Sequence, residues 1–504
     1  MENQASHLSG RKLLLIYMAL FLFYSCGRVE RHENNPTGSN SSKPNIIMIV
    51  VDDLRWDELS VMGHPFLQTP NIDRLAHEGA LFENAYQVVP LCSPNRASIL
   101  TGQYPSRHGI IDNVARDQAS HKLSLFAGEL QKAGYETAHI GKWHMGNDAS
   151  PRPGYDYWTC LPGQGRSIDP VLYENGQLDT IQGYVTDILT EKAVNFIQKN
   201  HERPFFLYLG HKVIHPDLRQ LDNGAIDLTS KPQFTPAPRH EGRYRDATIV
   251  RSRNAINSYS QIDSQSVVGQ ALIEKNAPEI LSTFGNALLD HFTSDETIRD
   301  RSEMLLAIDE GLGAILKTLA DREIPNQTFI LFTSDNGYFY GEHGLSIERR
   351  LPYEESVRTP LLVRYPPLIK PATRVNEFVL SIDYAPTALK LAHAAVDPSI
   401  QGDSFIPLFK ENTKPWRTSF LMEYYSYENP MPWLIDTDYK ALRTEKYKYI
   451  RWFKHENKNE LYDLETDPYE LNNLYHEKSM EEIILEMENL MAREVAKSFG
   501  LSMH

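Results

Sequence analysis

Three short apolar segments constrain the fold of this chain more than any other feature. They span residues 45–51, 205–209 and 328–334, and each is a nearly continuous run of apolar residues. A strand of a parallel sheet is buried on both faces and is typically such a run, whereas a half-exposed strand alternates polar and apolar residues. Residues 186–198 and 300–319 instead show the apolar spacing of amphipathic helices. The chain is therefore predicted to be an α/β protein with a large central, mostly parallel sheet sandwiched by helices.

Oxygen-bearing side chains directly follow two of these predicted strands. Asp52 and Asp53 come after the first, and Asp335 and Asn336 come after the third. Open α/β sheets bind ligands beyond the carboxyl ends of their strands. Two adjacent aspartates are often only a solvated turn, but a metal would give a reason to hold both charges together. A set made only of oxygen donors favours Ca²⁺ or Mg²⁺ over zinc or copper.

The segment 89–102 is predicted to contain a short helix with a candidate reactive cysteine at its N-terminus. Ser93 followed by Pro94 is typical of a helix N-terminus, and Gly102 can end the helix. Cys92 would lie just ahead of that N-terminus, where free N–H groups and the helix dipole stabilise an anion. Arg96, one turn on, adds a planar positive charge that can hold an oxyanion. The alternative interpretation is a buried cysteine before an ordinary helix.

The order Cys-x-Pro-x-Arg, followed by Ala-Ser-Ile-Leu-Thr-Gly, resembles the signature of the type I sulfatases of the alkaline phosphatase superfamily. Segments 101–105 and 107–109 also resemble the family, and further matches extend from about residue 44 to residue 475. The resemblance implies an alkaline-phosphatase-like fold. It also implies that a maturation enzyme oxidises Cys92 to formylglycine, an aldehyde. The implied ligands of a calcium ion, with magnesium as the less favoured alternative, are Asp52, Asp53, Cys92, Asp335 and Asn336.

Two further segments combine lysine with histidine. The stretch Gly-Lys-Trp-His-Met-Gly contains Lys142 and His144 and follows a short predicted strand over residues 137–140. Lys212 and His215 follow the second apolar run in the order Lys…His-Pro. Without context, a Lys-x-His pair is usually a surface feature. The resemblance implies that Lys142 binds sulfate, that His144 acts in catalysis with Arg96, and that His215 protonates the departing alcohol, with Lys212 binding substrate.

The clearest departure from the family concerns a sulfate-binding lysine. Segments 341–345 and 353–361 match the family, and counting back from Tyr353 places Arg349 where many members have that lysine. The alignment is uncertain by one residue, so Arg350 is the second candidate for the same contact. Arginine keeps the positive charge but presents a planar fork in place of a point charge.

Net charge narrows the possible binding partners, and cysteine content narrows the possible kinds of fold. The formal net charge of −15 argues against nucleic acid as a partner. An anionic substrate would therefore need a local basic pocket on an acidic protein. Three cysteines in 504 residues exclude a disulfide framework.

The N-terminus predicts export from a bacterial cell to the periplasm or cell surface. Arg11 and Lys12 precede an apolar run over residues 13–24, which is too short to span a bilayer. Residues 22–26, which end at Cys26, resemble a bacterial lipoprotein cleavage box. Residues 1–26 are thus predicted to be the signal, with Cys26 lipidated as the only membrane contact, and 27–43 a flexible tether. Ordinary signal cleavage nearby or an uncleaved anchor are the alternatives.

The remainder is predicted to form a catalytic domain over residues 44–400 and a subdomain over residues 401–504. Alternating patterns at 439–443 and 446–450 predict antiparallel strands, and a helix is expected over about 480–499. The family resemblance implies a small antiparallel sheet of four strands with one helix. Residues 217–300 show no clear periodicity and are predicted to be an insertion near the pocket rim.

The resemblance implies an enzyme that hydrolyses sulfate monoesters. Segments 154–158 and 163–165 resemble the loops of sulfatases that act on sulfated sugars, so the expected partner is a sulfated carbohydrate. Two alternatives remain open. One is a phosphonate or phosphate ester hydrolase of the same superfamily, and the other is a non-catalytic glycan-binding protein with the same fold.

Overall fold

The computed structural model describes residues 43–174, 176–219, 227, 232–256, 291–346, 349–410, 415–426, 434 and 436–499. The predicted signal, Cys26 and all but the last residue of the tether lie outside the described residues, as does about half of the predicted insertion over residues 217–300. Among the described residues, no helix combines the length and apolar character that a membrane crossing would need.

A mixed, mostly parallel sheet of ten strands forms the centre of the fold. In order across the sheet, the strands are β11 (Thr373–Val375), β2 (Ala80–Phe82), β10 (Leu361–Arg364), β9 (Thr328–Ser334), β1 (Asn45–Val51), β8 (Phe205–Gly210), β4 (Glu136–Lys142), β5 (Tyr157–Leu161), β6 (Val171–Glu174) and β7 (Gln177–Thr180). The strands from β9 to β5 in this order are all parallel to one another.

The three apolar runs form adjacent strands at the centre of this sheet. β1 pairs with β8 on one side and with β9 on the other, and every residue of β8 and β9 is buried. Alternate side chains of β1 enter opposite layers: Ile47 and Ile49 join one apolar cluster, and Ile46 and Met48 join another. Burial of each such side chain stabilises the fold by about 1.5–3 kcal/mol. The predicted doubly covered parallel sheet is confirmed.

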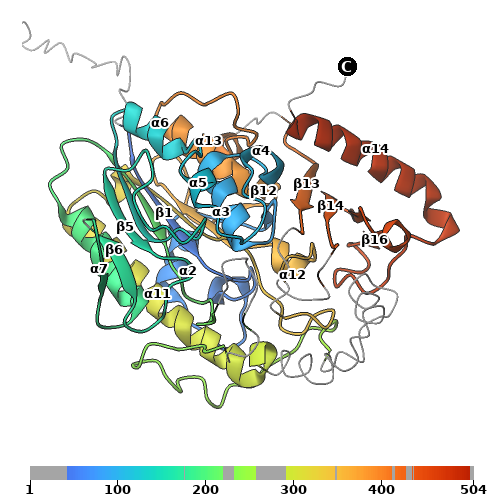
Figure 1. Cartoon of the computed structure of the whole chain (residues 1–504), viewed down its shortest axis with the longest axis horizontal. Coiled ribbons are helices and arrows are strands. Elements are labelled where there is room, and N and C mark those ends of the chain that lie inside the picture. Colours follow the sequence, from blue (N-terminus) through green and yellow to red (C-terminus); the bar gives the residue numbers. More distant parts are fainter. Residues whose placement is uncertain are drawn as a thin grey trace, which may run out of the picture. The chain divides into compact units, whose positions relative to one another are not determined.

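Helices cover both faces of the sheet (Figure 1). The layer on the Ile47 face contains α2 (Pro70–Glu78), α7 (Val185–Gln198) and α11 (Asp295–Asp321). The layer on the Ile46 face contains α3 (Cys92–Thr101), α6 (Phe126–Lys132) and α13 (Tyr384–Leu391). α11 begins five residues earlier than its apolar spacing predicts, because the Ser294 hydroxyl caps it by accepting a hydrogen bond from Thr297 N at 3.1 Å.

A separate antiparallel sheet of four strands lies near the C-terminus, as predicted. Its strands, in order, are β13 (Ser419–Tyr424), β14 (Tyr439–Thr444), β15 (Tyr447–Trp452) and β16 (Glu460–Asp463). The helix α14 (Glu481–Ser498) packs on β13 and β14, and its Met487 and Met491 share an apolar cluster with Leu421 and Leu442. Figure 1 shows this helix beside the small sheet. The domain boundary at residue 400 stays a prediction.

The other described elements are short. They are β3 (Ala85–Tyr86) paired with β12 (Val379–Leu380), the helices α4 (Pro105–His108), α5 (Asp117–Ser120) and α12 (Glu354–Val357), and single 3-10 turns at Ser60–Met62, Pro325–Gln327, Ser381–Asp383, Ile406–Phe409, Glu456–Lys458 and Lys478–Met480.

Candidate active site

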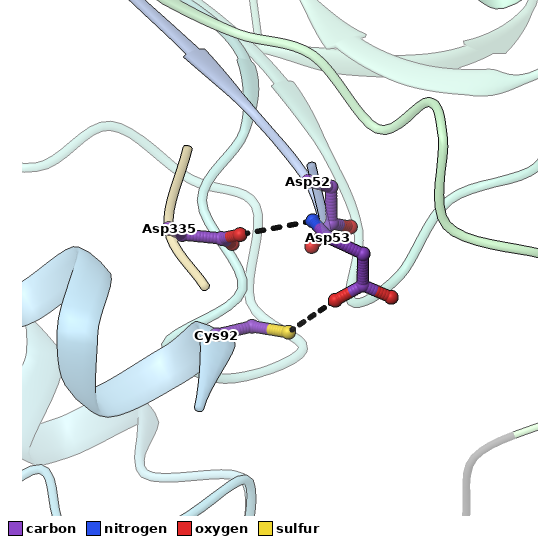
Figure 2. A group of neighbouring side chains, drawn as sticks. All are labelled: Asp52, Asp53, Cys92 and Asp335. Carbon is purple, nitrogen blue, oxygen red and sulfur yellow. Dashed lines mark hydrogen bonds between the residues drawn. The ribbon is translucent and has the colours of Figure 1, made fainter. Parts of the chain in front are cut away.

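A buried group of three carboxylates and one thiol lies at the carboxyl end of the parallel strands. Asp52 and Asp53 follow β1, Asp335 follows β9, and Cys92 is the first residue of α3. One ligand atom from each lies within 4.8 Å of those of the others (Figure 2). β1 and β9 are neighbouring parallel strands, so their carboxyl ends meet at one edge of the sheet. Four of the five predicted cation ligands therefore lie together.

The start of α3 differs from its prediction. The helix includes Cys92 in its first turn, Leu91 is at the N-cap, and the hydroxyl of Ser93 makes no capping hydrogen bond. The side chain of Asn113 supplies the acceptor instead, because its Oδ1 accepts a hydrogen bond from Ser93 N at 3.1 Å. Gly102 ends the helix as predicted, with a φ of 68° that favours glycine.

The thiol of Cys92 lies between a carboxylate and a guanidinium. Its Sγ is 3.9 Å from Asp53 Oδ1 and 3.6 Å from Arg349 Nη2. Burial, followed by the negative charge of Asp52, raises the pKa of this thiol well above its usual value. The thiol is therefore protonated at neutral pH, and a protonated thiol is a weak nucleophile.

The three carboxylates differ in their pKa values because their neighbours differ. Burial opposes ionisation of all three, but Lys142 Nζ donates a hydrogen bond to Asp52 Oδ2 and helps to lower the pKa of Asp52 well below its usual value. Burial raises the pKa of Asp53, although the charge of Arg349 opposes this. Burial also raises the pKa of Asp335, to about 7. The neighbouring cations thus offset burial for Asp52 but not for the other two carboxylates.

Three buried oxygen atoms of the cluster fit a hard divalent cation. Asp52 Oδ1, Asp53 Oδ2 and Asn336 Oδ1 have no hydrogen-bond partner among the described residues. Buried polar atoms are normally paired, so three such oxygens in one place call for a ligand. Carboxylate and amide oxygens are the donors that Ca²⁺ and Mg²⁺ take. Asn336 Nδ2 donates to Asp53 Oδ1 at 2.7 Å, which orients the amide within the cluster.

Arg96 and Lys142 are fully buried against this cluster. Arg96 Nε donates to Asp335 Oδ2 at 2.7 Å, and Arg96 Nη1 donates to the carbonyl oxygen of Lys142 at 3.0 Å. Lys142 ends β4, and its Nζ donates to Asp52 and, at 2.5 Å, to Gln164 Oε1. Arg96 is paired with Asp335 and Lys142 with Asp52, and contact of the two cations with an anionic substrate stays a prediction.

Of the two neighbouring arginines, Arg349 reaches the cluster with its guanidinium. Arg349 Nε lies 2.9 Å from Asp53 Oδ1, and Arg349 Nη1 has no hydrogen-bond partner among the described residues. Arg350 is also buried, and its carbonyl oxygen accepts a hydrogen bond from Tyr439 Oη of β14 at 2.9 Å. The contacts of Arg349 thus agree with counting back from Tyr353, while the sulfate contact itself stays a prediction.

Lys212 lies in the turn after β8 with several intramolecular partners. Its Nζ donates to Ser167 Oγ at 3.1 Å, to the carbonyl oxygen of His215 at 2.9 Å, and to Asp217 Oδ1. A lysine ammonium has three donors, so these contacts account for all of them. This geometry fixes the turn that carries His215. Binding of substrate by Lys212 remains a prediction.

The two candidate histidines lie in different surroundings. His215 Nδ1 donates to the carbonyl oxygen of Pro216 at 2.7 Å, and its Nε2 lies 3.9 Å from Asp53 Oδ2. Burial keeps the pKa of His215 well below its usual value. His144 is buried with a left-handed φ of 64° and lines a cavity of about 390 Å³. The same cavity is lined by polar side chains that include Asn113, Asn147, Gln164 and Arg219.

A family model described as "Sulfatase" matches residues 44–394. This chain belongs to the sulfatase family. A second model, described as "N-sulphoglucosamine sulphohydrolase, C-terminal", matches residues 341–497 of this sulfatase. The protein is a sulfuric ester hydrolase of the alkaline phosphatase superfamily, which confirms the resemblance of its motifs.

Two proteins similar to this chain act on amino sugars. This sulfatase is 30% identical to the N-acetylglucosamine-6-O-sulfatase of Bacteroides thetaiotaomicron, over 93% of this chain and 88% of the relative. A solved sulfatase structure in complex with its substrate D-glucosamine-2-N,6-O-disulfate has a TM-score of 0.74 and 28% identity, covering 91% of this chain and 98% of that one.

A phosphonate monoester hydrolase of Agrobacterium radiobacter has the same fold, with a TM-score of 0.68 and 19% identity over 90% of this chain and 96% of that one. The fold alone therefore does not separate sulfate from phosphonate chemistry.

Some residues that shape the site of this sulfatase were not among the predicted site residues. Asn95 Nδ2 donates to the carbonyl oxygen of Asp335 at 2.5 Å, and Gln164 holds Lys142. Arg301 of α11 donates to the carbonyl oxygen of Asp53 at 2.8 Å. Asn95 lies inside the Cys-x-Pro-x-Arg signature, which offered a hint. Arg301 is one of several basic residues in an amphipathic helix, and its position in the sequence gave no hint of a role in the site.

Substitutions of Arg349 should show whether its planar guanidinium binds sulfate through two hydrogen bonds or acts only through its positive charge. Arg349→Lys keeps the charge but loses one of two charge-assisted hydrogen bonds to an oxyanion. Such bonds contribute roughly 1.5–3 kcal/mol each, so kcat/KM for a sulfate ester should fall about tenfold or more. Arg349→Ala should lower kcat/KM further, because an anion would face a buried pocket with less positive charge.

The same two changes at Arg350 provide the matched comparison, with activity expressed per folded molecule. They should lower kcat/KM less than the changes at Arg349. Wild-type kinetics for Arg349→Ala together with a crippled Arg350→Ala would show that the sulfate contact belongs to Arg350.

Proposed function

We propose that this sulfatase hydrolyses sulfate monoesters of a sulfated carbohydrate with a formylglycine nucleophile made from Cys92 and a bound calcium ion. The observation that carries the proposal is the position of Cys92 within 4.8 Å of three buried carboxylates, with the guanidinium of Arg349 beside its sulfur. The oxygens of Asp52, Asp53 and Asn336 that have no hydrogen-bond partner among the described residues support a hard cation, and calcium follows from the resemblance of the Ser-Asp-Asn-Gly segment.

The modified residue and the cation would supply an oxygen nucleophile and positive charge next to the sulfate. Arg96 of α3, Lys142 at the end of β4 and Arg349 in the loop before α12 each contact a carboxylate of the cluster. We assign to their charges the neutralisation of the sulfate oxygens as negative charge develops on them. Because all three are buried and held by hydrogen bonds or ion pairs, they are in place before substrate binds.

Proton transfer is assigned to the two histidines. The carbonyl oxygen of Pro216 occupies Nδ1–H of His215, so a proton for the departing alcohol must be carried on Nε2, and His215 takes up this second proton as an imidazolium before the alcohol departs. His144 lines the cavity next to Gln164 and is assigned the deprotonation that releases sulfate and restores the aldehyde. The polar lining of this cavity suits a leaving group rich in hydroxyls. We place the leaving sugar there.

The names of the relatives support an amino sugar as the substrate, and a substrate panel tests this. D-glucosamine 6-sulfate, N-acetylglucosamine 6-sulfate, an aryl sulfate, a phosphate diester and a phosphonate monoester should be compared side by side. We expect kcat/KM to be highest for a sulfated sugar and lowest for the phosphorus esters. A preference for the phosphonate ester would replace the proposal with the alternative hydrolase activity. Binding of sulfated sugars without turnover of any ester would indicate a non-catalytic protein.

We also propose that the enzyme is exported and lipid-anchored through Cys26 on the basis of the sequence alone. Wild-type protein should then sediment with the membrane fraction of its bacterial host, and Cys26→Ser should move it to the soluble periplasmic fraction. Fractionation followed by an assay for sulfatase activity measures this. Wild-type protein in the soluble fraction would indicate ordinary signal cleavage, and a Cys26→Ser variant that stays in the membrane would indicate an uncleaved anchor.

A further inference from the structure

A buried guanidinium on α11 connects the segments that carry the site, although it touches neither Cys92 nor the basic residues around it. Arg301 is fully buried, and its Nη2 donates to the carbonyl oxygen of Asp53 at 2.8 Å. The same nitrogen lies 3.1 Å from Glu58 Oε2, which neutralises the charge.

The same guanidinium also holds the segment that follows β9. Arg301 Nε donates to Tyr340 Oη at 2.6 Å, and the guanidinium carbon lies 4.0 Å from the centre of the Tyr338 ring. Tyr340 Oη in turn donates to Glu58 Oε1. One network therefore joins α11, the residues that follow β1 and the loop that follows β9. Tyr338 and Tyr340 come three and five residues after Asp335. The loop that leaves the cluster is therefore packed against Arg301.

The backbone of Asp53 makes this support necessary. Asp53 has a left-handed φ of 61°, which is uncommon for a residue other than glycine. Its N–H donates to Asp335 Oδ1 at 3.2 Å and its carbonyl oxygen accepts from Arg301, so the peptide groups on both sides are tied down. Arg301 Nη1 also approaches the carbonyl oxygen of Ile214 at 3.5 Å, next to His215.

We infer that Arg301 is a positioning residue that fixes Asp53 for cation binding and aligns it with the Asp335 loop and the His215 turn. The inference rests on the proposed role of Asp53 as a cation ligand. Replacing a side chain that orients a metal ligand by hydrogen bonding typically changes metal affinity or activity by about 10–100-fold. A lysine can keep the charge next to Glu58, but it cannot reach Asp53, Glu58 and Tyr340 with one rigid fork.

The test measures cation binding apart from catalysis. Chelator-stripped wild type, Arg301→Met and Arg301→Lys are titrated with Ca²⁺ and, separately, with Mg²⁺ by calorimetry, and thermal unfolding is recorded for each stripped protein. Arg301→Met should weaken Ca²⁺ binding by about 10–100-fold, and Arg301→Lys should fall between it and wild type. At saturating Ca²⁺, kcat should fall while KM for a sulfate ester changes little.

Arg299→Met is the matched control. Arg299 lies on the same helix, is partly exposed, and donates to the carbonyl oxygen of Ala247 at 3.0 Å, away from Asp53. This variant should bind Ca²⁺ and turn over substrate like wild type.

The inference is overturned if the Arg301 variants unfold at lower temperature yet keep the wild-type affinity for Ca²⁺ and the wild-type kcat. Arg301 would then stabilise the folded core without affecting cation binding. If Arg301→Met does not fold, the Ca²⁺ affinity and kcat of Arg301→Lys are compared with those of wild type instead. Wild-type protein that binds neither Ca²⁺ nor Mg²⁺ would instead contradict the proposed cation site, and this inference with it.

Discussion

Replacing Cys92 with alanine is expected to lower kcat for a sulfate ester by roughly 10⁴-fold or more while the protein stays folded. The loss follows from removal of the atom that becomes the nucleophile. The fold should survive because the side chain is small and its only described polar contacts are long, at 3.9 Å and 3.6 Å. Steady-state kinetics and thermal unfolding of the same preparation measure both effects.

Cys160→Ala is the control for loss of a buried thiol. Cys160 lies in β5 and is also buried, and its Sγ donates to the carbonyl oxygen of Leu161 at 3.3 Å. This variant should retain wild-type turnover. A Cys92→Ala enzyme that retained substantial turnover would mean that another group attacks the sulfur.

Asp335→Ala should remove both the bound calcium and the activity. It deletes one oxygen ligand, and it leaves the buried Arg96 without its partner at 2.7 Å. Breaking a buried ion pair in this way typically costs about 3–5 kcal/mol of stability. Asp335→Asn keeps the shape and one oxygen, so it should lose calcium affinity and turnover with a smaller loss of stability. Metal analysis of the purified protein and denaturant unfolding measure the two effects separately.

A change in a buried ion pair outside the carboxylate cluster controls for the loss of stability. Asp383 is buried and pairs with Arg417, with Asp383 Oδ1 accepting from Arg417 Nη2 at 2.9 Å. Asp383→Asn should lower stability but leave calcium at full occupancy in the folded fraction. Calcium retained at full occupancy in Asp335→Ala would argue against the ligand assignment.

The sequence predicted the frame of the fold and the location of the cluster well, for a specific physical reason. β1 and β9 have the bounds that the sequence predicted, because strands covered on both faces consist mostly of apolar residues. Since both strands are parallel and central, the side chains that follow them had to meet. The proximity of Asp52, Asp53 and Asp335 thus followed from sequence order and strand type.

Side-chain direction in irregular segments could not be predicted in the same way. A motif alignment cannot choose between Arg349 and Arg350, because adjacent residues of a loop point according to its backbone. Asn113, rather than the hydroxyl of Ser93, supplies the acceptor at the start of α3, through a contact between residues 20 positions apart. Arg301 lies 248 positions from the carbonyl that it holds. Such contacts exist only once the chain is packed.

The central claim, that Cys92 works as formylglycine, is tested most directly by mass spectrometry of the peptide that contains this residue. The protein should be prepared with and without a formylglycine-generating enzyme, and the specific activity of each preparation measured on a sulfate ester. The account predicts a peptide in which an aldehyde replaces the thiol, in a fraction that rises in proportion to specific activity. A fully active preparation in which Cys92 remains an unmodified thiol would contradict it.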